Sequence, residues 1–260
     1  MHKKKLVEII EGFCPSETAE TWDNCGFQLD LGGALKEIRK VLVSLEVTEA
    51  VIDEAIELGA DLILTHHPLL FSGVKKIEEE DVTGNYLIRL IREGISVYSC
   101  HTSFDKLPGG NNDYLGFMLD LENIRPFDRD NGFCRKGRPP FSATFAELIG
   151  AASEALSMEK RYFRWTGDLT KTIETVGWCT GAGSEFIKAA WEDGCDLYIT
   201  GDLKYHEAQM AKEMGLCVLD IGHYGSEKIF AENMADMLRE HIGAEDVEIF
   251  CSEKDLNPFL

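Results

Sequence analysis

Two short apolar runs joined by a helical segment constrain the fold of this chain more than any other feature. Residues 38–45 are rich in valine and leucine, and residues 61–65 form a second apolar run of strand length. Between them apolar residues recur at helical spacing, with Thr48 placed to cap the helix and Gly59 to stop it. Because parallel strands need a crossover of this kind, the pattern predicts a β-α-β unit.

The same pattern returns in the second half of the chain. A shift of 135 residues, which places Thr65 on Thr200, aligns a strand, a helix, a glycine stop and a second strand in the same order. Two β-α-β units share some matches by coincidence, but both copies also contain Gly-x-Asp-Leu-x-x-Thr, which favours duplication. We therefore expect an α/β fold with two similar, duplicated lobes, mainly parallel sheets and a site in the cleft between them.

Periodicity and stop signals place the remaining elements. We expect helices over residues 6–13, 84–92, 144–156, 184–192, 204–214 and from about 228 to 241, and strands over 95–100, 173–178, 196–200, 216–221 and 247–251. Between residues 122 and 140 the periodicity fades while Gly, Pro and Arg accumulate. The predicted domains are a first lobe over residues 1–122, a connecting segment over 123–143, and a second lobe over 144–260 that the last strand closes.

Adjacent histidines end the strand over residues 61–65. His66 and His67 follow it directly, and Pro68 then prevents a simple continuation of regular structure. Side chains at the carboxyl end of a strand in an open α/β sheet face the crevice where ligands bind, so two imidazoles there favour a metal site. Taken alone, a histidine pair favours an ordinary polar loop.

Other metal-binding residue types follow strands in the same way. Asp105 comes after the strand over 95–100, and His223 and Glu227 come after the strand over 216–221. The last two are spaced i, i+4, which places them on one face if the following helix has already started at His223. Three imidazoles and two carboxylates can hold two divalent cations, because a carboxylate can bridge them. The set His66, His67, Asp105, His223 and Glu227 thus predicts a dinuclear site.

A pair of metal ions about 3.5–4 Å apart lowers the pKa of a bridging water and stabilises charge on a phosphoryl or carbonyl oxygen, which predicts hydrolysis. His101 is a candidate proton carrier beside the ligands. His206 is better explained by a helical ion pair with Asp202. The sequence contains neither a Gly-x-Ser-x-Gly nucleophile elbow nor a phosphate-binding GxxxxGK[ST] loop.

Net charge and cysteine content limit the partners and the compartment expected for this chain. The 46 acidic and 26 basic residues give a formal charge of −20, which opposes binding to nucleic acid. The basic residues between Arg129 and Arg138 are expected in a solvated loop, and Trp22 to Gly26 form a turn that is either structural or functional. No run suits a signal peptide or a membrane span. The eight cysteines contain no Cys-x-x-Cys, which fits a reducing cytoplasm.

Several motifs together resemble the Nif-three-like family, whose members are widely labelled GTP cyclohydrolase type-two homologues. They include Thr-His-His-Pro-Leu-Leu-Phe at 65–71, Gly-His-Tyr-Gly-Ser-Glu at 222–227, and the segments 22–26, 101–113 and 201–208. Ser103-Phe104 stands where the family more often has Asn-Leu, and the insertion domain that some members carry between the halves is absent. Neither difference affects a predicted ligand.

The resemblance implies that His66, His67, Asp105, His223 and Glu227 bind two divalent metal ions per subunit, in a toroidal homohexamer. Imidazole and carboxylate ligands suit Zn, Mn, Fe, Ni or Co. The implied function is a metal-dependent hydrolase acting on a small, nucleotide-like substrate or a related heterocycle. Two alternatives are a non-catalytic metal-binding scaffold for regulation or interaction, and metal storage or delivery. The second of these would require readily exchanged ions.

Overall fold

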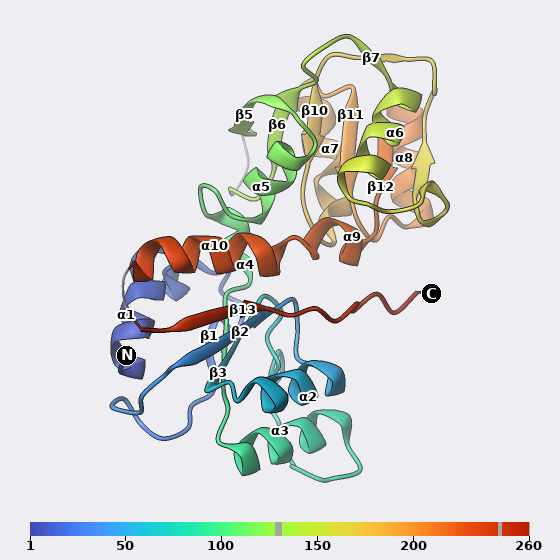
Figure 1. The fold of residues 1–260 in the computed structure, drawn as a ribbon. Helices are drawn as coiled ribbons and strands as arrows, with labels where there is room; N and C mark the ends of the chain where they lie inside the picture. Colours follow the sequence, from blue (N-terminus) through green and yellow to red (C-terminus); the bar gives the residue numbers. More distant parts are fainter. Residues whose placement is uncertain (128–131, 244–245, 260) are drawn as a thin grey trace. The chain divides into compact units, whose positions relative to one another are not determined.

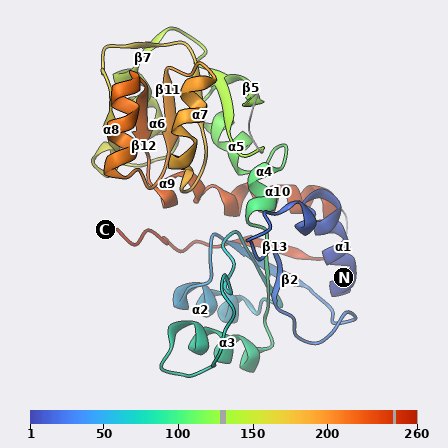
Figure 2. The ribbon, with the colours of Figure 1, turned by 180° about the vertical axis from the view of Figure 1, so that it is seen from behind.

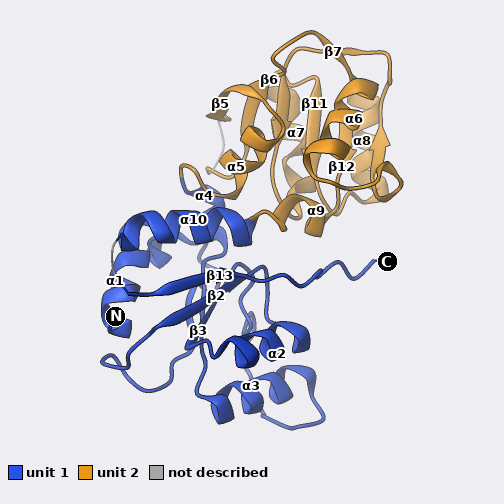
Figure 3. Ribbon diagram, in the orientation of Figure 1, with its two compact units in different colours: residues 1–107, 230–260 blue, residues 108–229 orange. Residues whose placement is uncertain are grey.

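The computed structural model describes residues 1–127, 132–243 and 246–259 and divides into two compact units (Figure 3). Unit 1 contains residues 1–107 and 230–260, and unit 2 contains residues 108–229. This division differs from the predicted lobes in two segments. Residues 108–122 belong to unit 2, and the C-terminal residues return to unit 1 because their strand pairs with a strand near the N-terminus.

Unit 1 is built on a five-stranded sheet with the order β1-β4-β3-β2-β13. The strands are β1 (Gly26–Leu29), β2 (Lys40–Ser44), β3 (Leu62–Thr65), β4 (Ser96–Ser99) and β13 (Glu248–Cys251). All neighbouring strands run parallel except β1, which pairs antiparallel with β4 at one edge. The predicted β-α-β unit is therefore present, since β2 and β3 are parallel neighbours joined by a helix.

Helices cover both faces of this sheet. α1 (Lys3–Phe13) and α10 (Phe230–Ile242) lie on one face, whereas α2 (Glu49–Leu58) and α3 (Val82–Glu93) lie on the other (Figures 1 and 2). Thr48 caps α2 by accepting from the Val51 amide, and Gly59 ends the helix with a φ of 66°. Both ends of α2 are thus where the sequence predicts them. The short helix α4 (Thr102–Lys106) follows β4.

Unit 2 contains a six-stranded sheet with the order β5-β6-β10-β11-β12-β8. Its strands are β5 (Glu122–Pro126), β6 (Arg135–Arg138), β8 (Arg164–Thr166), β10 (Val176–Trp178), β11 (Leu197–Thr200) and β12 (Cys217–Asp220). The central strands β10, β11 and β12 are parallel, and the outer pairings are antiparallel. A small separate sheet joins β7 (Ala143–Thr144) and β9 (Thr172–Ile173).

Alternating side chains of β11 divide the core of unit 2 into two layers. Leu197 and Ile199 pack with residues of α5 (Asn111–Met118) and α6 (Phe145–Ala155). Tyr198 points to the opposite face and packs with α7 (Ile187–Glu192) and α8 (Tyr205–Met214). Figures 1 and 2 show these helix pairs on opposite faces of the sheet. Because successive side chains of a strand point to opposite faces, β11 contributes to both layers. The mixed α/β class with parallel central strands is confirmed.

The prediction of an irregular connection over residues 122–140 is wrong. Much of it forms β5 and β6, and the side chains of Arg135 and Lys136 are buried rather than in a solvated loop. Arg135 pairs with Asp113, and Lys136 pairs with Asp193. A solvated loop was predicted for these charged residues because the sequence alone does not reveal such buried ion pairs. Arg129, the first residue of the predicted basic loop, lies outside the described residues.

Two further corrections concern the C-terminal part. The predicted strand over 247–251 forms β13, but it pairs with β2 in unit 1 instead of closing the second sheet. The helix expected after residue 227 is preceded by a separate short helix, α9 (His223–Glu227), before α10 begins at Phe230. Short 3-10 turns occur at η1 (Ser16–Thr18), η2 (Lys160–Tyr162) and η3 (Gly183–Phe186). Over the described ranges, every helix is too short or too polar to cross a membrane.

Candidate metal centre

The central strand of unit 1 delivers the histidine pair. β3 lies between β2 and β4, and the His66 amide beyond its end donates to the carbonyl oxygen of Leu45 at 3.1 Å. Nδ1 of the fully buried His66 ring lies 2.9 Å from the Cys100 carbonyl oxygen. Because a carbonyl only accepts, Nδ1 carries the hydrogen and the lone pair is on Nε2. That Nε2 atom lies 3.5 Å from Oδ1 of Asp105 on α4.

A second imidazole of unit 1 is oriented by a carboxylate. Nδ1 of His101 lies 2.8 Å from Oδ1 of Asp23, whose side chain is completely buried. Burial favours the neutral acid, but hydrogen bonds from His101 and Thr102 outweigh it and hold the pKa of Asp23 well below its ordinary value. The ionised carboxylate can only accept, so His101 also donates from Nδ1 and keeps its lone pair on Nε2.

Three histidine rings of unit 1 form one cluster. Each of His66, His67 and His101 offers a nitrogen within 4.8 Å of the nitrogens of the other two. The ring centroids are 5.1 Å apart for His66 and His101, and 5.2 Å apart for His66 and His67. The half-exposed ring of Trp22 lies against His101, with 6.2 Å between centroids. Three clustered nitrogen donors beside the Asp105 carboxylate are a suitable donor set for a transition metal ion.

Unit 2 positions a histidine and a carboxylate on one short helix. His223 and Glu227 lie one turn apart on α9, with Nε2 of His223 and Oε2 of Glu227 separated by 2.9 Å. Nδ1 of His223 lies 2.9 Å from Oδ2 of Asp202, the residue two positions beyond β11. Gly181 allows the approach of the Glu227 carboxylate, because a Cβ there would lie 2.3 Å from Oε1.

These arrangements fit a bound metal. In His66, His101 and His223 an acceptor engages Nδ1, which directs the lone pair of Nε2 towards a ligand position, as in most protein metal sites. Nε2 of His223 and the Glu227 carboxylate oxygen are both electron-rich at 2.9 Å, so a proton or a cation must lie between them. Each unit therefore has a possible metal-binding group with orienting partners.

The structure brings together the predicted residues within each unit, and it adds two residues. Four predicted side chains gather at the carboxyl ends of β3 and β4 in unit 1, namely His66, His67, His101 and Asp105. In unit 2, His223 pairs with Glu227. Asp23 and Asp202 were not predicted as orienting partners. Asp23 belongs to the turn at residues 22–26, for which the sequence allows a functional as well as a structural interpretation. Orientation by Asp202 requires contacts that its position in the sequence does not reveal.

The predicted ion pair of His206 with Asp202 is wrong. Asp202 adopts a left-handed conformation with a φ of 54°, and α8 begins only at Tyr205, so the two residues do not share a helix. Asp202 contacts His223 instead.

Sequence comparison identifies relatives over the whole chain. Residues 1–258 match the family described as Duf34/NIF3 (NGG1p interacting factor 3). A protein of Clostridium perfringens named GTP cyclohydrolase 1 type 2 homolog is 37% identical, and the match covers 100% of this chain and 99% of the relative. NIF3-like protein 1 of Drosophila melanogaster is 31% identical over 98% of this chain and 87% of its own length.

Solved structures show the same fold. The crystal structure of a Bacillus cereus protein related to NIF3 has a TM-score of 0.92 at 22% identity, covering 100% of this chain and 99% of that one. Reduced HcgD from Methanocaldococcus jannaschii has a TM-score of 0.82 at 30% identity and covers 98% of both chains.

Proposed function

Because this chain belongs to the Duf34/NIF3 family, we propose that it is a metal-dependent hydrolase acting on a nucleotide or a related heterocycle. One observation carries this proposal. His66 and His223 each have Nδ1 engaged by an acceptor, so that Nε2 is presented as a metal ligand. A histidine in an ordinary polar loop does not need such an orienting partner.

The proposed centre holds two divalent metal ions, bound by His66, His67, Asp105, His223 and Glu227. Three imidazoles and two carboxylates can hold two divalent cations, because a carboxylate can bridge them. Zn, Mn, Fe, Ni and Co all accept imidazole and carboxylate ligands.

The chemistry of the bound ions would be activation of water at neutral pH and stabilisation of negative charge on a phosphoryl or carbonyl oxygen. Residues of the chain would orient the imidazole rings and transfer protons. Asp23 and Asp202 hold the rings of His101 and His223 in one tautomer. We assign His101 as the proton carrier, because Asp23 fixes its tautomer and leaves the lone pair of Nε2 available to accept a proton.

A nucleotide-like substrate is supported by the names of the relatives, several of which are called GTP cyclohydrolase 1 type 2 homolog. The sequence adds a second reason: metal ions offset the formal charge of −20 locally, which would admit an anionic substrate to an acidic protein.

The test is turnover of GTP and a panel of phosphoesters and cyclic amides by purified, metal-loaded protein. We expect at least one substrate to be hydrolysed, and we expect His67→Ala and Glu227→Ala to abolish that turnover. His206→Ala is the matched control, since His206 is exposed and outside the histidine cluster. If no substrate turns over and the two ligand variants change nothing in cells, the enzyme proposal fails.

A non-catalytic interaction scaffold is the second candidate. It is favoured by exposed apolar residues of unit 1 between β3 and the start of α3, namely Phe71, Val74, Ile77 and Val82. The family description also contains the words interacting factor. Under this alternative a partner protein would bind His67→Ala and Glu227→Ala as well as the parent chain, whereas a hydrolase would lose activity in both variants.

We also propose that the chain assembles as a homohexamer in the cytoplasm. The family resemblance implies the hexamer, and the eight free cysteines suit a reducing compartment. Light scattering coupled to size-exclusion chromatography should give six times the chain mass of 29.1 kDa, and a monomer mass would contradict the assembly.

A further inference from the structure

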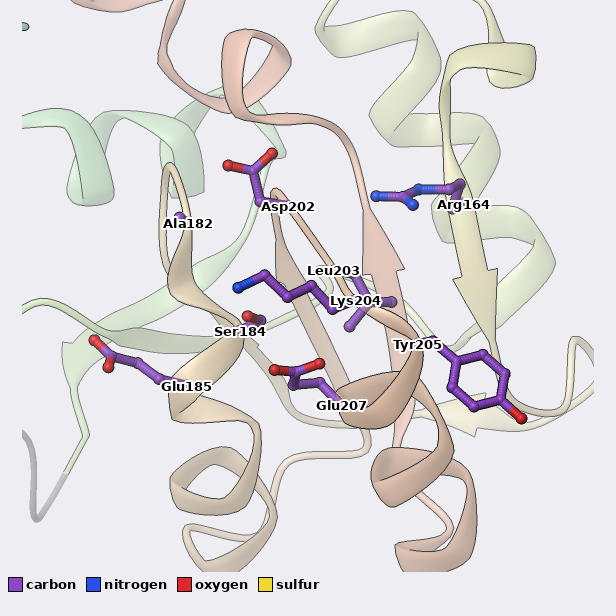
Figure 4. Close-up of a pocket in the computed structure, with 9 residues that line it drawn as sticks. All are labelled: Arg164, Ala182, Ser184, Glu185, Asp202, Leu203, Lys204, Tyr205 and Glu207. Carbon is purple, nitrogen blue, oxygen red and sulfur yellow. The ribbon is translucent and has the colours of Figure 1, made fainter.

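Unit 2 contains an open pocket that the proposed metal ligands do not use. Its volume is about 720 Å³, and it lies at the carboxyl end of β11, between the loop that follows β10 and the start of α8 (Figure 4). Asp202, which orients His223, is one of its lining residues. Pockets of about 300–1,000 Å³ accommodate small organic ligands, so this one can hold a substrate of nucleotide size.

Lys204 places a positive charge in this pocket. Its side chain is exposed, and within the described parts of the chain it has neither an ion-pair partner nor a hydrogen bond. Figure 4 shows the side chain extending across the pocket, with Asp202 on one side and Glu207 on the other. An ammonium group only donates hydrogen bonds, so a ligand group that Lys204 binds must be an acceptor.

Glu207 supplies the complementary group. Its Oε2 atom is buried and has no hydrogen-bond partner in the described structure. Removing a carboxylate oxygen from water without a donor is costly, and a ligand N–H group would offset that cost. Lys204 and Glu207 therefore present a donor and an acceptor in the same pocket.

We propose that this pocket binds the heterocyclic base of the substrate through a cyclic-amide edge of the guanine type. A lactam places a carbonyl acceptor beside a ring N–H donor, which matches Lys204 and Glu207 in turn. Guanine adds an exocyclic amino group, so two adjacent N–H donors face the Glu207 carboxylate. Adenine has a ring nitrogen acceptor in place of that N–H, and it would face the carboxylate unfavourably. This assignment rests on the proposed function.

Arg164 provides a place for an anionic substituent. Its guanidinium group is mostly exposed and is fixed by a 2.5 Å hydrogen bond to the buried carboxylate of Asp220. Figure 4 shows it at the side of the pocket opposite Glu185. A fixed positive charge beside the base pocket suits a phosphate of the same ligand, so a nucleotide should bind more tightly than its nucleoside.

The experiment is calorimetric titration of the full-length protein, with a chelator present, using guanosine monophosphate (GMP), its 1-methyl derivative, adenosine monophosphate and guanosine. We expect saturable binding of GMP, weaker binding of guanosine, and at least about tenfold weaker binding of the 1-methyl and adenosine ligands, as the loss of a charged hydrogen bond predicts. No saturable binding of GMP, or equal binding of GMP and its 1-methyl derivative, would overturn the proposal without any variant.

Variants then test the two recognition residues. Glu207→Gln and Lys204→Met should each weaken GMP binding at least about tenfold. Glu185→Gln is the matched control, because it removes the same charge from a pocket residue whose carboxylate points away from Lys204 and Glu207 in Figure 4. If Glu185→Gln weakens binding as much as Glu207→Gln, the assignment is wrong.

The chelator separates this proposal from the metal-dependent activity. Binding that depends on Glu207, without turnover by the metal-loaded protein, would refute only the proposed hydrolase. Turnover without any effect of Glu207→Gln on GMP binding would refute only the base pocket.

Discussion

The ends of β3 in unit 1 and β11 in unit 2 are equivalent positions in two sheets with the same central order, and they carry different chemistry. β3 is flanked by parallel β2 and β4, and β11 by parallel β10 and β12. The shift of 135 residues places His66 on Gly201 and His67 on Asp202. One strand end therefore provides imidazoles, and the other provides a glycine and a carboxylate.

Backbone packing explains this difference. A Cβ on Gly201 would lie 2.7 Å from the His223 amide nitrogen and 2.8 Å from the Gly181 carbonyl oxygen, so no side chain fits there. His66, by contrast, is accommodated in a buried position. In unit 2 the neighbouring strand β12 leads instead to His223, and Asp202 holds its ring. Both sheets place candidate ligands after the strand next to the central one, β4 or β12, but only unit 1 also places them after its central strand β3. The duplication itself remains a prediction.

Gly201→Ala should have the largest effect on the free energy of unfolding. The added methyl group meets backbone atoms that cannot rotate away, so we expect a loss of about 3 kcal/mol in the free energy of unfolding, at the upper end for overpacking. Urea denaturation measures this loss. Gly73→Ala adds the same atoms in open space and should change the free energy by less than about 0.5 kcal/mol. Equal stability of the two variants would contradict the steric explanation.

Asp23→Asn and Asp202→Asn compare the two orienting carboxylates. Asp202→Asn should lower metal affinity by roughly 10–100-fold, because an amide no longer fixes the tautomer of the ligand His223. Asp23→Asn should leave metal affinity nearly unchanged, because Asp23 orients the proton carrier His101. Only Asp23→Asn should destabilise the fold, since its side chain is buried whereas that of Asp202 is 53% exposed. Chelator competition and denaturation measure the two effects. Glu213→Gln, an exposed change on α8, serves as the control, and an equal loss of affinity there would refute orientation as the cause.

Thr48→Ala and Thr144→Ala should give the smallest effects, at about 1 kcal/mol of unfolding free energy each. Thr48 caps α2 with one hydrogen bond, whereas Thr144 and Glu147 cap α6 reciprocally. We therefore expect the larger loss in Thr144→Ala. Serine at either position keeps the hydroxyl and should retain most of the stability. A larger loss in Thr48→Ala would contradict the role of the reciprocal cap.

Local patterns were sufficient to predict most helices and parallel strands, because apolar periodicity and glycine stops act within a few residues. The strand over 61–65 and the stop at Gly59 are examples. Long-range pairing was not predictable in the same way. β13 could be recognised as a strand, but nothing near residues 248–251 indicates that β2 is its neighbour. Likewise, Arg135 and Lys136 read as loop residues because their partners are distant in sequence.

The candidate ligands could be predicted from residue type, whereas the residues that orient them could not. Histidines and carboxylates after apolar strands stand out in a sequence, and the structure gathers His66, His67, His101 and Asp105 within unit 1. Asp23 and Asp202 act through contacts with rings far away in sequence, so only the folded chain reveals them. The steric role of Gly201 also depends on backbone atoms from two other loops.

Elemental analysis of the purified protein tests the central claim most directly. We predict two divalent transition metal ions per chain, a reduced content in His66→Ala and in Glu227→Gln, and an unchanged content in His206→Ala. Circular dichroism on the same samples would show that the variants are folded. A chain that contains no such metal, or that keeps its full metal content in both ligand variants, would contradict a metal centre built from these residues.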